Sequence, residues 1–313
     1  MDPNAPHKNS FEDLLAATAP LDPIPTAIVH PVDAASIEGA LAARDHTLIT
    51  PILVGPRARI EAAAAEADLD ISGIEMVETE HSHDSAEKSV ELVHEGRALA
   101  LMKGALHTDE VMSAAVNKSK GLRTSRRMSH VFVLDVPTYP KPLLITDAAI
   151  NIYPDLMAKA DIVQNAIEMA QALDVETPKV AILSALETVY PKIPSTLEAA
   201  ALCKMADRGQ ITGGILEGPL AFDNAISAKA AKTKGIVSDV PGDADILVAP
   251  DLEAGNMIAK QLMYLAGADS AGIVLGARVP IMLTSRADGT LSRLVSAALA
   301  QCLVHHAKGK GAL

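Results

Sequence analysis

Aromatic side chains are scarce in this sequence, where they form 2% of the 313 residues and include no tryptophan. Stacking platforms for nucleic-acid bases are therefore few. Positive charge is also in short supply, because the formal net charge is −12 and such a chain repels the phosphates of DNA and RNA. These deficits argue against a nucleic-acid partner. They leave room for a small anionic substrate wherever basic side chains gather locally.

Cysteine is nearly absent as well. Cys203 and Cys302 are the only two, too few for a disulfide framework, and no Cys/His cluster suggests a bound metal. No stretch reaches the roughly 18 apolar residues of a membrane span, and the N-terminus lacks a basic segment followed by an apolar one. We therefore expect a soluble, cytoplasmic protein that binds no metal and no membrane.

What the chain has is aliphatic. Hydrophobic residues make up 49% of the sequence, so the core must be built from Ala, Val, Leu, Ile and Met. The length exceeds the roughly 250–300 residues at which one hydrophobic core usually divides, which favours two domains. A proline-rich break at residues 136–142 is the expected domain joint, because prolines interrupt strand ladders and stiffen connections.

Short apolar runs alternate with longer segments of helical period, which predicts a doubly wound α/β fold with helices on both faces of a parallel sheet. The expected strands are residues 26–30, 51–55, 74–77, 98–102, 131–136, 143–146, 180–184, 211–216, 245–249, 272–275 and 280–284. The expected helices include residues 84–94, 109–118, 158–173, 196–206, 256–266 and 291–306.

The most informative segment begins where the last apolar run ends, at Ser285, Arg286 and Asp288. A helix start offers backbone N–H groups and a positive dipole end, and an Arg fork matches phosphate geometry. The spacing of Ser285 and Asp288 is equally that of a helix capping box. Arg286 favours a functional role, because a cation in a first helical turn is electrostatically out of place without an anion nearby.

Two further segments carry cations. Ligands bind at the carboxyl ends of parallel strands, and the run 98–102 is followed by Lys103, a glycine and Thr108, which could hold an anion. Thr108 or Asp109 could equally be an ordinary helix N-cap. Residues 123–127 hold three arginines in an acidic protein. They form either a solvated loop or a local positive funnel for an anionic substrate.

Two loops after predicted strands are less specific. Residues 213–224 have the glycine density of a loop whose backbone approaches a ligand or a neighbouring helix. Asp251 and Glu253 stand two apart after the run 245–249, with no histidine nearby, so a dedicated metal site is not expected. A structural or substrate-loop role is expected there instead.

Six motifs together resemble the phosphate acetyltransferase and phosphate butyryltransferase family, and they occur in the family's order between about residues 25 and 305. They are Leu101-Met102-Lys103-Gly104-Ala105-Leu106-His107-Thr108, Gly121-Leu122-Arg123-Thr124, Thr146-Asp147-Ala148-Ala149-Ile150-Asn151, Gly218-Pro219-Leu220, Pro250-Asp251-Leu252-Glu253-Ala254-Gly255-Asn256 and Thr284-Ser285-Arg286-Ala287-Asp288.

The resemblance implies reversible transfer of an acyl group between coenzyme A and inorganic phosphate, through a ternary complex without a covalent acyl-enzyme. Acyl-CoA, CoA, phosphate and acyl phosphate are then substrates, and no cofactor is needed. It also implies two α/β/α domains with the active-site cleft between them, in a homodimer. Domain I would comprise residues 1–137 and 283–313. Domain II, residues 138–282, would supply one wall of the cleft and much of the dimer contact.

The family's Ser-Arg pair falls on Ser285 and Arg286. The resemblance makes Arg286 the clamp for phosphate and oxyanion, Ser285 a hydrogen-bond donor to the same centre and Arg123 a second phosphate anchor. Lys103, Thr108 and Arg127, which lie in the two cation-bearing segments, are expected to bind substrate as well. A general base would help, because a free thiol has a pKa of about 8.5. The acetyltransferase pattern has its aspartate where this chain has Ser292, so Asp288 is the expected base.

The departures from the family pattern bear on chemistry and substrate. Ala148 stands where many acetyltransferases carry a cysteine, so inactivation by thiol reagents at that place is not expected. Acetyl is expected as the acyl group, with propionyl and butyryl as alternatives, because one methylene changes discrimination by only about 1–3 kcal/mol.

Two other classes of protein remain open. One is a non-catalytic domain of this fold that binds acyl-CoA or a partner. The other is a metal- and nicotinamide-dependent decarboxylating dehydrogenase, although no GxGxxG fingerprint follows the early strands.

Overall fold

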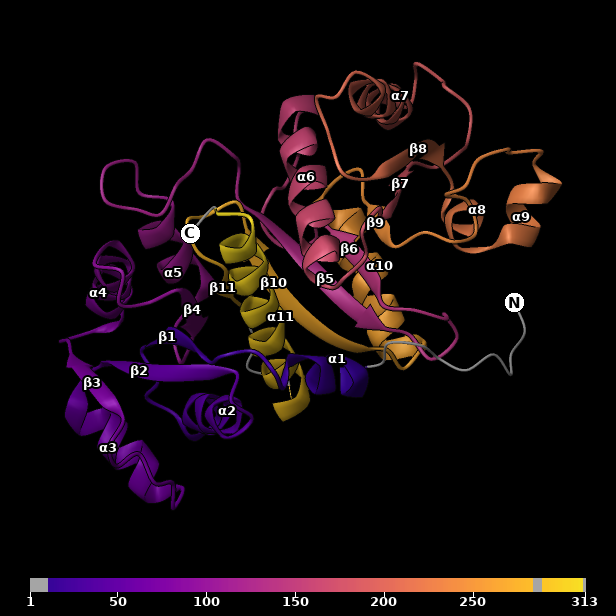
Figure 1. Ribbon diagram of the computed structural model, residues 1–313. Coiled ribbons are helices and arrows are strands. Elements are labelled where there is room, and N and C mark those ends of the chain that lie inside the picture. The colour runs from indigo at the N-terminus through magenta and orange to yellow at the C-terminus, as the bar shows by residue number, and fades with distance from the viewer. Residues whose placement is uncertain (1–10, 284–288, 312–313) are drawn as a thin grey trace. The chain divides into compact units, whose positions relative to one another are not determined.

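The computed structural model describes residues 11–283 and 289–311. The chain separates into two compact units. Unit 1 contains residues 127–270 together with the start of α1 (Phe11–Thr18), and unit 2 contains residues 14–126 and 271–311. Both are mixed α/β structures (Figure 1), which confirms the fold class expected from the alternating pattern.

Unit 2 is built on parallel strands. They are β1 (Ile24–Val29), β2 (Ile49–Gly55), β3 (Glu75–Glu78), β4 (Ala100–Lys103) and β11 (Ile281–Met282), in the order β3-β2-β1-β4-β11. The strand β10 (Asp269–Leu275) pairs antiparallel with β11. The chain therefore runs outward from β1 to β3 and returns to the other side of β1 as β4.

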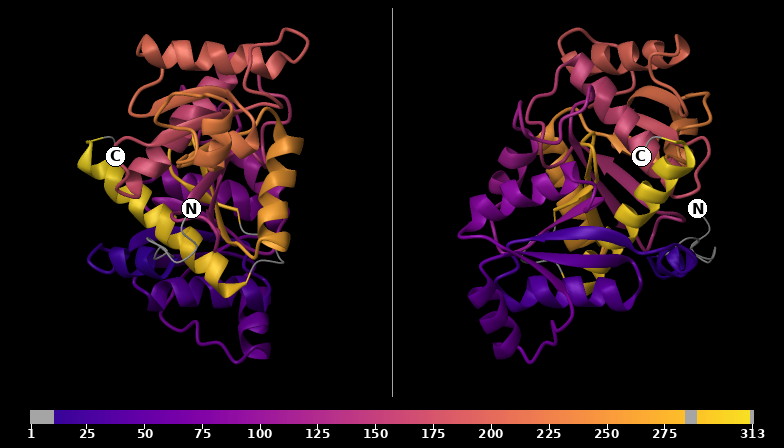
Figure 2. Two further views of the ribbon diagram at one scale, coloured as in Figure 1. Left: turned by 90° about the vertical axis from the view of Figure 1, so that its right-hand side faces the viewer. Right: turned by 60° about the vertical axis from the view of Figure 1, so that its left-hand side comes forward.

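The helices of unit 2 cover both faces of this sheet. They are α2 (Ala34–Asp45), α3 (Arg57–Glu66), α4 (Ser82–His94), α5 (Thr108–Ala115) and α11 (Thr290–Gly309). The helix α4 packs with α5, whereas α11, yellow in Figure 2, packs against α2. Ile28, Leu53, Leu101 and Leu299 are at most 1% exposed. Burying each such side chain contributes about 1.5–3 kcal/mol.

Unit 1 has the strands β5 (Ser129–Asp135), β6 (Leu143–Thr146), β7 (Lys179–Leu183), β8 (Ile215–Leu220) and β9 (Ile246–Val248), in the order β5-β6-β9-β7-β8. Strands β6, β9, β7 and β8 are parallel, and β5 is antiparallel to β6. Its helices are α6 (Leu156–Ala172), α7 (Pro194–Asp207), α8 (Phe222–Ile226), α9 (Ala228–Thr233) and α10 (Leu252–Leu265). The helices α6 and α10 both pack on β5 and β6, from opposite sides (Figure 1).

The proline-rich segment 136–142 joins β5 to β6, two strands of the same unit. Tyr139 in this segment is 4% exposed, and its hydroxyl donates to the Ala244 carbonyl oxygen at 2.6 Å. The segment is thus a packed hairpin connection. The predicted domains, residues 1–137 with 283–313 and residues 138–282, have other bounds than these two compact units and stay a prediction.

One strand was misplaced by the sequence pattern. The expected strand 211–216 begins too early, because Gly213 has a φ of +84° and β8 starts only at Ile215. The strand continues through Gly218, where a Cβ would lie 2.8 Å from the Ile182 Cβ and 3.2 Å from the Ala199 Cβ. This glycine therefore allows close packing on a neighbouring strand and helix.

Candidate active site

The carboxyl ends of β1 and β4 meet at the point in unit 2 where the order of strands reverses. Open α/β sheets bind ligands at such a switch point. Lys103 is the last residue of β4 and pairs with Val29 at the end of β1. The predicted substrate residue Lys103 therefore lies at the edge where a ligand site is expected.

The loop after Lys103 folds tightly over the end of β1. The Gly104 N–H donates to the Val29 carbonyl oxygen and the Ala105 N–H to the His30 carbonyl oxygen, each at 2.9 Å. A Cβ on Gly104 would lie 2.5 Å from the Val29 oxygen. Within the described structure, Gly104 is therefore required for this approach to β1.

The Lys103 ammonium turns back into its own loop. Its Nζ donates to the carbonyl oxygens of Gly104 at 3.3 Å and Leu106 at 3.2 Å, and the residue is 5% exposed. These bonds give the ammonium a structural role in closing the loop. Its role in binding substrate stays a prediction.

Thr108 is the exposed first residue of α5. The N-cap residue is His107, so the expected N-cap at Thr108 or Asp109 was wrong. The His107 N–H donates to Glu110 Oε2 at 2.8 Å, which fixes the entry of the chain into the helix. Thr108 and Lys103 therefore lie at the two ends of one short loop, residues 104–107.

The sequence pattern missed a polar chain at the ends of β1 and β3. His30 Nδ1 lies 3.0 Å from Ser85 Oγ, and Thr79 Oγ1 lies 2.8 Å from the same oxygen. Burial lowers the pKa of His30, and the charge of Arg59 acts in the same direction. One signal for this polar chain was available in the sequence, the position of His30 at the end of an apolar strand run. Its partners Thr79 and Ser85 lie 49 and 55 residues further along the chain, so the pattern could not identify them.

Arg123 lies in unit 2 on a segment pinned by its backbone. It forms an isolated antiparallel bridge with Ala277, and the flanking Leu122 carbonyl oxygen accepts from the Arg278 N–H at 2.9 Å. Thr124 Oγ1 donates to the Gly276 carbonyl oxygen at 2.8 Å. The backbone is thus fixed while the Arg123 side chain is exposed.

Arg127 belongs to unit 1, unlike the other three predicted substrate-binding residues. Its N–H donates to Asp161 Oδ2 and its carbonyl oxygen accepts from Asn165 Nδ2, both at 2.9 Å. The exposed guanidinium donates from Nη1 to Asn151 Oδ1 at 3.3 Å. Its backbone is therefore held on two sides while its charge reaches solvent.

The end of β6 carries a buried carboxylate that the sequence showed only as part of a family motif. Asp147 is 3% exposed. Its Oδ1 accepts from the N–H groups of Ala149 and Ile150 at 2.9 and 3.0 Å, and its Oδ2 accepts from Asn151 N at 3.2 Å and Asn151 Nδ2 at 2.6 Å. All four bonds use the carboxylate as an acceptor, the role of its ionised form.

His130 lies beside this carboxylate on β5. Burial lowers the pKa of His130 to about 4, although the Asp147 charge acts in the opposite direction. The residue is 2% exposed, and its Nδ1 has no hydrogen-bond partner. The imidazole is therefore neutral near pH 7.

Ser285, Arg286 and Asp288, the predicted catalytic residues, lie outside the described residues. The flanking elements are described: Met282 at the end of β11 pairs with Met102, and α11 begins after its N-cap Gly289. The helix α11 thus begins within two residues of the predicted start at residue 291. In the described structure, Lys103 and Thr108 lie at the two ends of one short loop, Arg123 lies on a second loop and Arg127 lies in the other unit.

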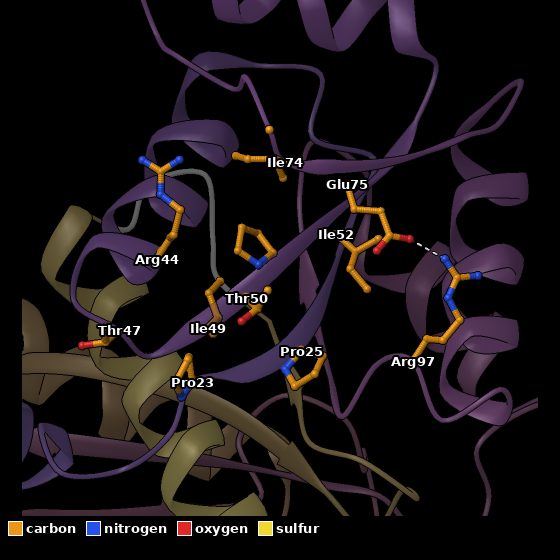
Figure 3. A pocket seen from close by; sticks show the side chains of 12 residues that line it. Pro23, Pro25, Arg44, Thr47, Ile49, Thr50, Ile52, Ile74, Glu75 and Arg97 are labelled. Carbon is orange, nitrogen blue, oxygen red and sulfur yellow. Dashed lines mark hydrogen bonds and ion pairs between the residues drawn. The ribbon is translucent and has the colours of Figure 1, made fainter.

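A cavity of about 560 Å³ lies elsewhere in unit 2, at the amino ends of β1, β2 and β3 (Figure 3). Arg97 on its wall is paired with Glu75 and Glu95, and Arg44 with Asp45. The remaining lining is mostly proline and isoleucine. We place the candidate active site at the carboxyl ends of the strands instead, because Lys103 and the start of α5 lie there and open α/β sheets bind ligands at that edge.

Within residues 11–283 and 289–311, no group of three or more His, Cys, Asp or Glu side chains is arranged to hold a metal ion. None of the helices described has the length and apolar character needed to cross a bilayer.

Both units have α/β architecture, and Lys103 lies at the carboxyl end of β4, at the switch point of the sheet in unit 2. Residues 79–301 match the family model described as phosphate acetyl/butaryl transferase. A phosphate acetyltransferase from Rhizobium meliloti is 60% identical over 93% of this chain and 92% of its own length. The chain belongs to this family, which confirms the resemblance seen in the sequence motifs.

Two other relatives widen the comparison. A phosphate butyryltransferase from Clostridium acetobutylicum is 39% identical over 93% of this chain and 97% of its own length. The crystal structure of a branched-chain phosphotransacylase from Enterococcus faecalis has a TM-score of 0.79 at 31% identity and covers 90% of this chain and 99% of its own. The family thus includes relatives named for different acyl groups.

Proposed function

We propose that this protein is a phosphate acetyltransferase, which moves an acetyl group reversibly between coenzyme A and inorganic phosphate. The observation that carries the proposal is 60% identity to a relative of that name across 93% of the chain. Butyryl transfer is the second candidate, because a relative named phosphate butyryltransferase matches over the same share of the chain at 39% identity.

In the proposed reaction, the sulfur of coenzyme A attacks the carbonyl carbon of acetyl phosphate in a ternary complex. A carbon–sulfur bond forms, the bond from carbon to the phosphate oxygen breaks, and the thiol proton passes to a base. Arg286 and Ser285 stabilise the oxyanion and the leaving phosphate, and Asp288 is the proposed base. Positive donors are the main requirement, because charge develops on oxygen in the transition state.

Lys103, Thr108, Arg123 and Arg127 are the proposed substrate-binding residues. The exposed guanidinium of Arg127 and the exposed side chain of Arg123 support this role, because both extend from backbones held by hydrogen bonds. Phosphate is recognised well by such forks, since two parallel N–H groups can reach two of its oxygens. The reaction proposed here uses no metal and no organic cofactor, and a cytoplasmic location stays a prediction.

The test is phosphate-dependent release of free coenzyme A from acetyl-, propionyl- and butyryl-CoA, followed with a thiol reagent. We expect acetyl-CoA to be used best and Arg286→Ala to reduce kcat by about 10²–10³-fold, as for loss of an oxyanion donor. A preference for butyryl-CoA would replace the acetyl assignment. If no substrate released thiol in the presence of phosphate, the chain would be a binding domain of this fold.

A homodimer is part of the proposal, and unit 1 offers a surface for it. Ile152 is 60% exposed, Tyr153 75%, Met257 64% and Tyr264 77%. The Leu252 N–H donates to the Ile152 carbonyl oxygen at 3.1 Å, so the loop and α10 lie together, and Met257 and Tyr264 are seven residues apart on one helix face. Light scattering should give a dimer for the wild type and a monomer for Met257→Glu; a wild-type monomer would exclude this arrangement.

A further inference from the structure

We infer that Asp147 and Asn151 are positioning residues, which aim the Arg127 guanidinium at an anionic group of the substrate. The inference rests on the proposed function, because it assigns the ligand of Arg127 to phosphate or to the phosphoryl group of acetyl phosphate. All three residues belong to unit 1, and their contacts are described in full by the structure around the end of β6.

Asp147 fixes the orientation of the Asn151 amide. The Asn151 Nδ2 donates to Asp147 Oδ2 at 2.6 Å and to the Met128 carbonyl oxygen at 2.9 Å. Rotating the amide by half a turn would set Oδ1 against a carboxylate and a carbonyl, both of which only accept. Asn151 is 7% exposed, so water cannot readily repair that mismatch.

With both amide hydrogens engaged, Asn151 Oδ1 is left as the acceptor for the guanidinium, and Arg127 Nη1 donates to it at 3.3 Å. An arginine has five N–H donors in a rigid plane. One bond at the edge of this plane fixes its direction and leaves other donors for a ligand.

Arg127 has the charge and exposure that this role requires. No carboxylate forms an ion pair with its guanidinium among the described residues, and Asp161 bonds to its backbone N–H instead. Asn165 holds the Arg127 carbonyl oxygen at 2.9 Å. A neutral amide thus directs the guanidinium and leaves its positive charge available to a ligand. An aspartate at position 151 would instead cancel that charge.

The test is a double-mutant cycle on the full-length protein with Asn151→Ala, Arg127→Ala and their combination. We expect Arg127→Ala to raise the KM for phosphate about tenfold, as for loss of a charge-assisted hydrogen bond. Asn151→Ala should raise it about fivefold alone and less than twofold in the Arg127→Ala background, because a residue that acts through Arg127 has nothing left to aim. An equal effect of Asn151→Ala in both backgrounds would overturn the inference.

Two further variants separate aiming from folding. Asn256 Nδ2 donates to the Ala148 carbonyl oxygen at 3.1 Å, so Asn256→Ala loosens the same loop without touching Arg127. Asn256→Ala should lose about as much thermal stability as Asn151→Ala, but its KM for phosphate should stay near that of the wild type. Asn151→Ser serves in the cycle if Asn151→Ala does not fold. A rise in KM as large for Asn256→Ala as for Asn151→Ala would mean that loop stability alone is being measured.

A binding measurement keeps this inference apart from the proposed reaction. Line broadening of the phosphorus resonance of inorganic phosphate reports binding without turnover, and the same four proteins can be titrated. Coupling between Asn151 and Arg127 in phosphate binding, with no turnover of acetyl-CoA, would retain the inference and remove the proposed function. Turnover that is insensitive to Arg127→Ala would retain the proposed function and remove the inference.

Discussion

One parallel strand in each unit has a buried charge at its carboxyl end, Lys103 on β4 in unit 2 and Asp147 after β6 in unit 1, and the two charges are used differently. In unit 2, Lys103 at the end of β4 turns its ammonium into the carbonyl oxygens of its own loop. In unit 1, Asp147 at the end of β6 is buried under four N–H donors and orders an amide that contacts an exposed arginine. A charge at a strand end therefore does not identify a ligand contact by itself, because both of these charges are buried and bonded to groups of their own loops.

The largest stability effect should come from Asp147→Asn. The amide would present hydrogens to groups that only donate, so we expect the free energy of unfolding to fall by about 4 kcal/mol. Asp161→Asn is the matched control, because Asp161 accepts one bond from the Arg127 N–H. Urea unfolding of the wild type, Asp147→Asn and Asp161→Asn measures these free energies. Equal, small losses for both variants would remove the contrast between the buried Asp147 and the half-buried Asp161.

A pH effect of similar size should come from His130. Burial lowers its folded-state pKa from 6.5 to about 4, so the unfolded chain binds the extra proton between these two values. The stability that the neutral imidazole contributes is complete above pH 6.5 and is lost as the pH falls toward 4, by about 3 kcal/mol in total.

Unfolding free energies at pH 7 and pH 4.5, for the wild type and for His130→Gln, measure this contribution. The variant should show a shallower decline over the interval. Identical slopes would place the acid sensitivity of unit 1 in its carboxylates instead.

A smaller loss should follow from Lys103→Met, which removes the hydrogen bonds of a buried ammonium to the carbonyl oxygens of Gly104 and Leu106. We expect the free energy of unfolding to fall by about 2 kcal/mol. Lys88→Met is the control, because Lys88 pairs with Glu91 on the exposed surface of α4 and such pairs contribute little. A stability like that of the control, combined with a large rise in the KM for phosphate, would move Lys103 from the structural group to the substrate-binding group.

The smallest effect is expected at Cys203 on α7. Burial raises the pKa of its thiol to about 12, and the charges of Glu217 and Asp207 act in the same direction. Iodoacetamide at pH 7.5 should therefore leave Cys203 unlabelled in the folded protein, as read by mass spectrometry against a denatured sample. Stoichiometric labelling of the folded protein would show that α7 opens readily.

Much of the fold could be predicted from periodicity alone. The strand at residues 143–146 was placed to the residue, and most others were placed within two or three. The strand β8 was misplaced because Gly218 and Pro219 suggest a loop, whereas in the structure the glycine packs against β7 and α7. A local pattern cannot show that a neighbouring backbone requires a glycine.

Less of the candidate site could be predicted. Lys103 was placed correctly at the end of its strand, yet the bonds of its ammonium depend on the path of the following loop. His30, Thr79 and Ser85 were missed, because their hydrogen bonds join separate segments that only folding brings together. Asp147 and Asn151 were visible as part of a family motif, but their link to Arg127 spans more than 20 residues of sequence.

By itself the sequence determined the alternation of strands and helices, the aliphatic core and the order of motifs that marks the family, because these depend on residue types and short spacings. Tertiary structure alone decided which charges are buried, which are paired and which reach solvent. The physical reason is that desolvation and hydrogen bonding act between groups brought together by folding, so Lys103 and Arg127, both cations at predicted ligand segments, acquire different surroundings.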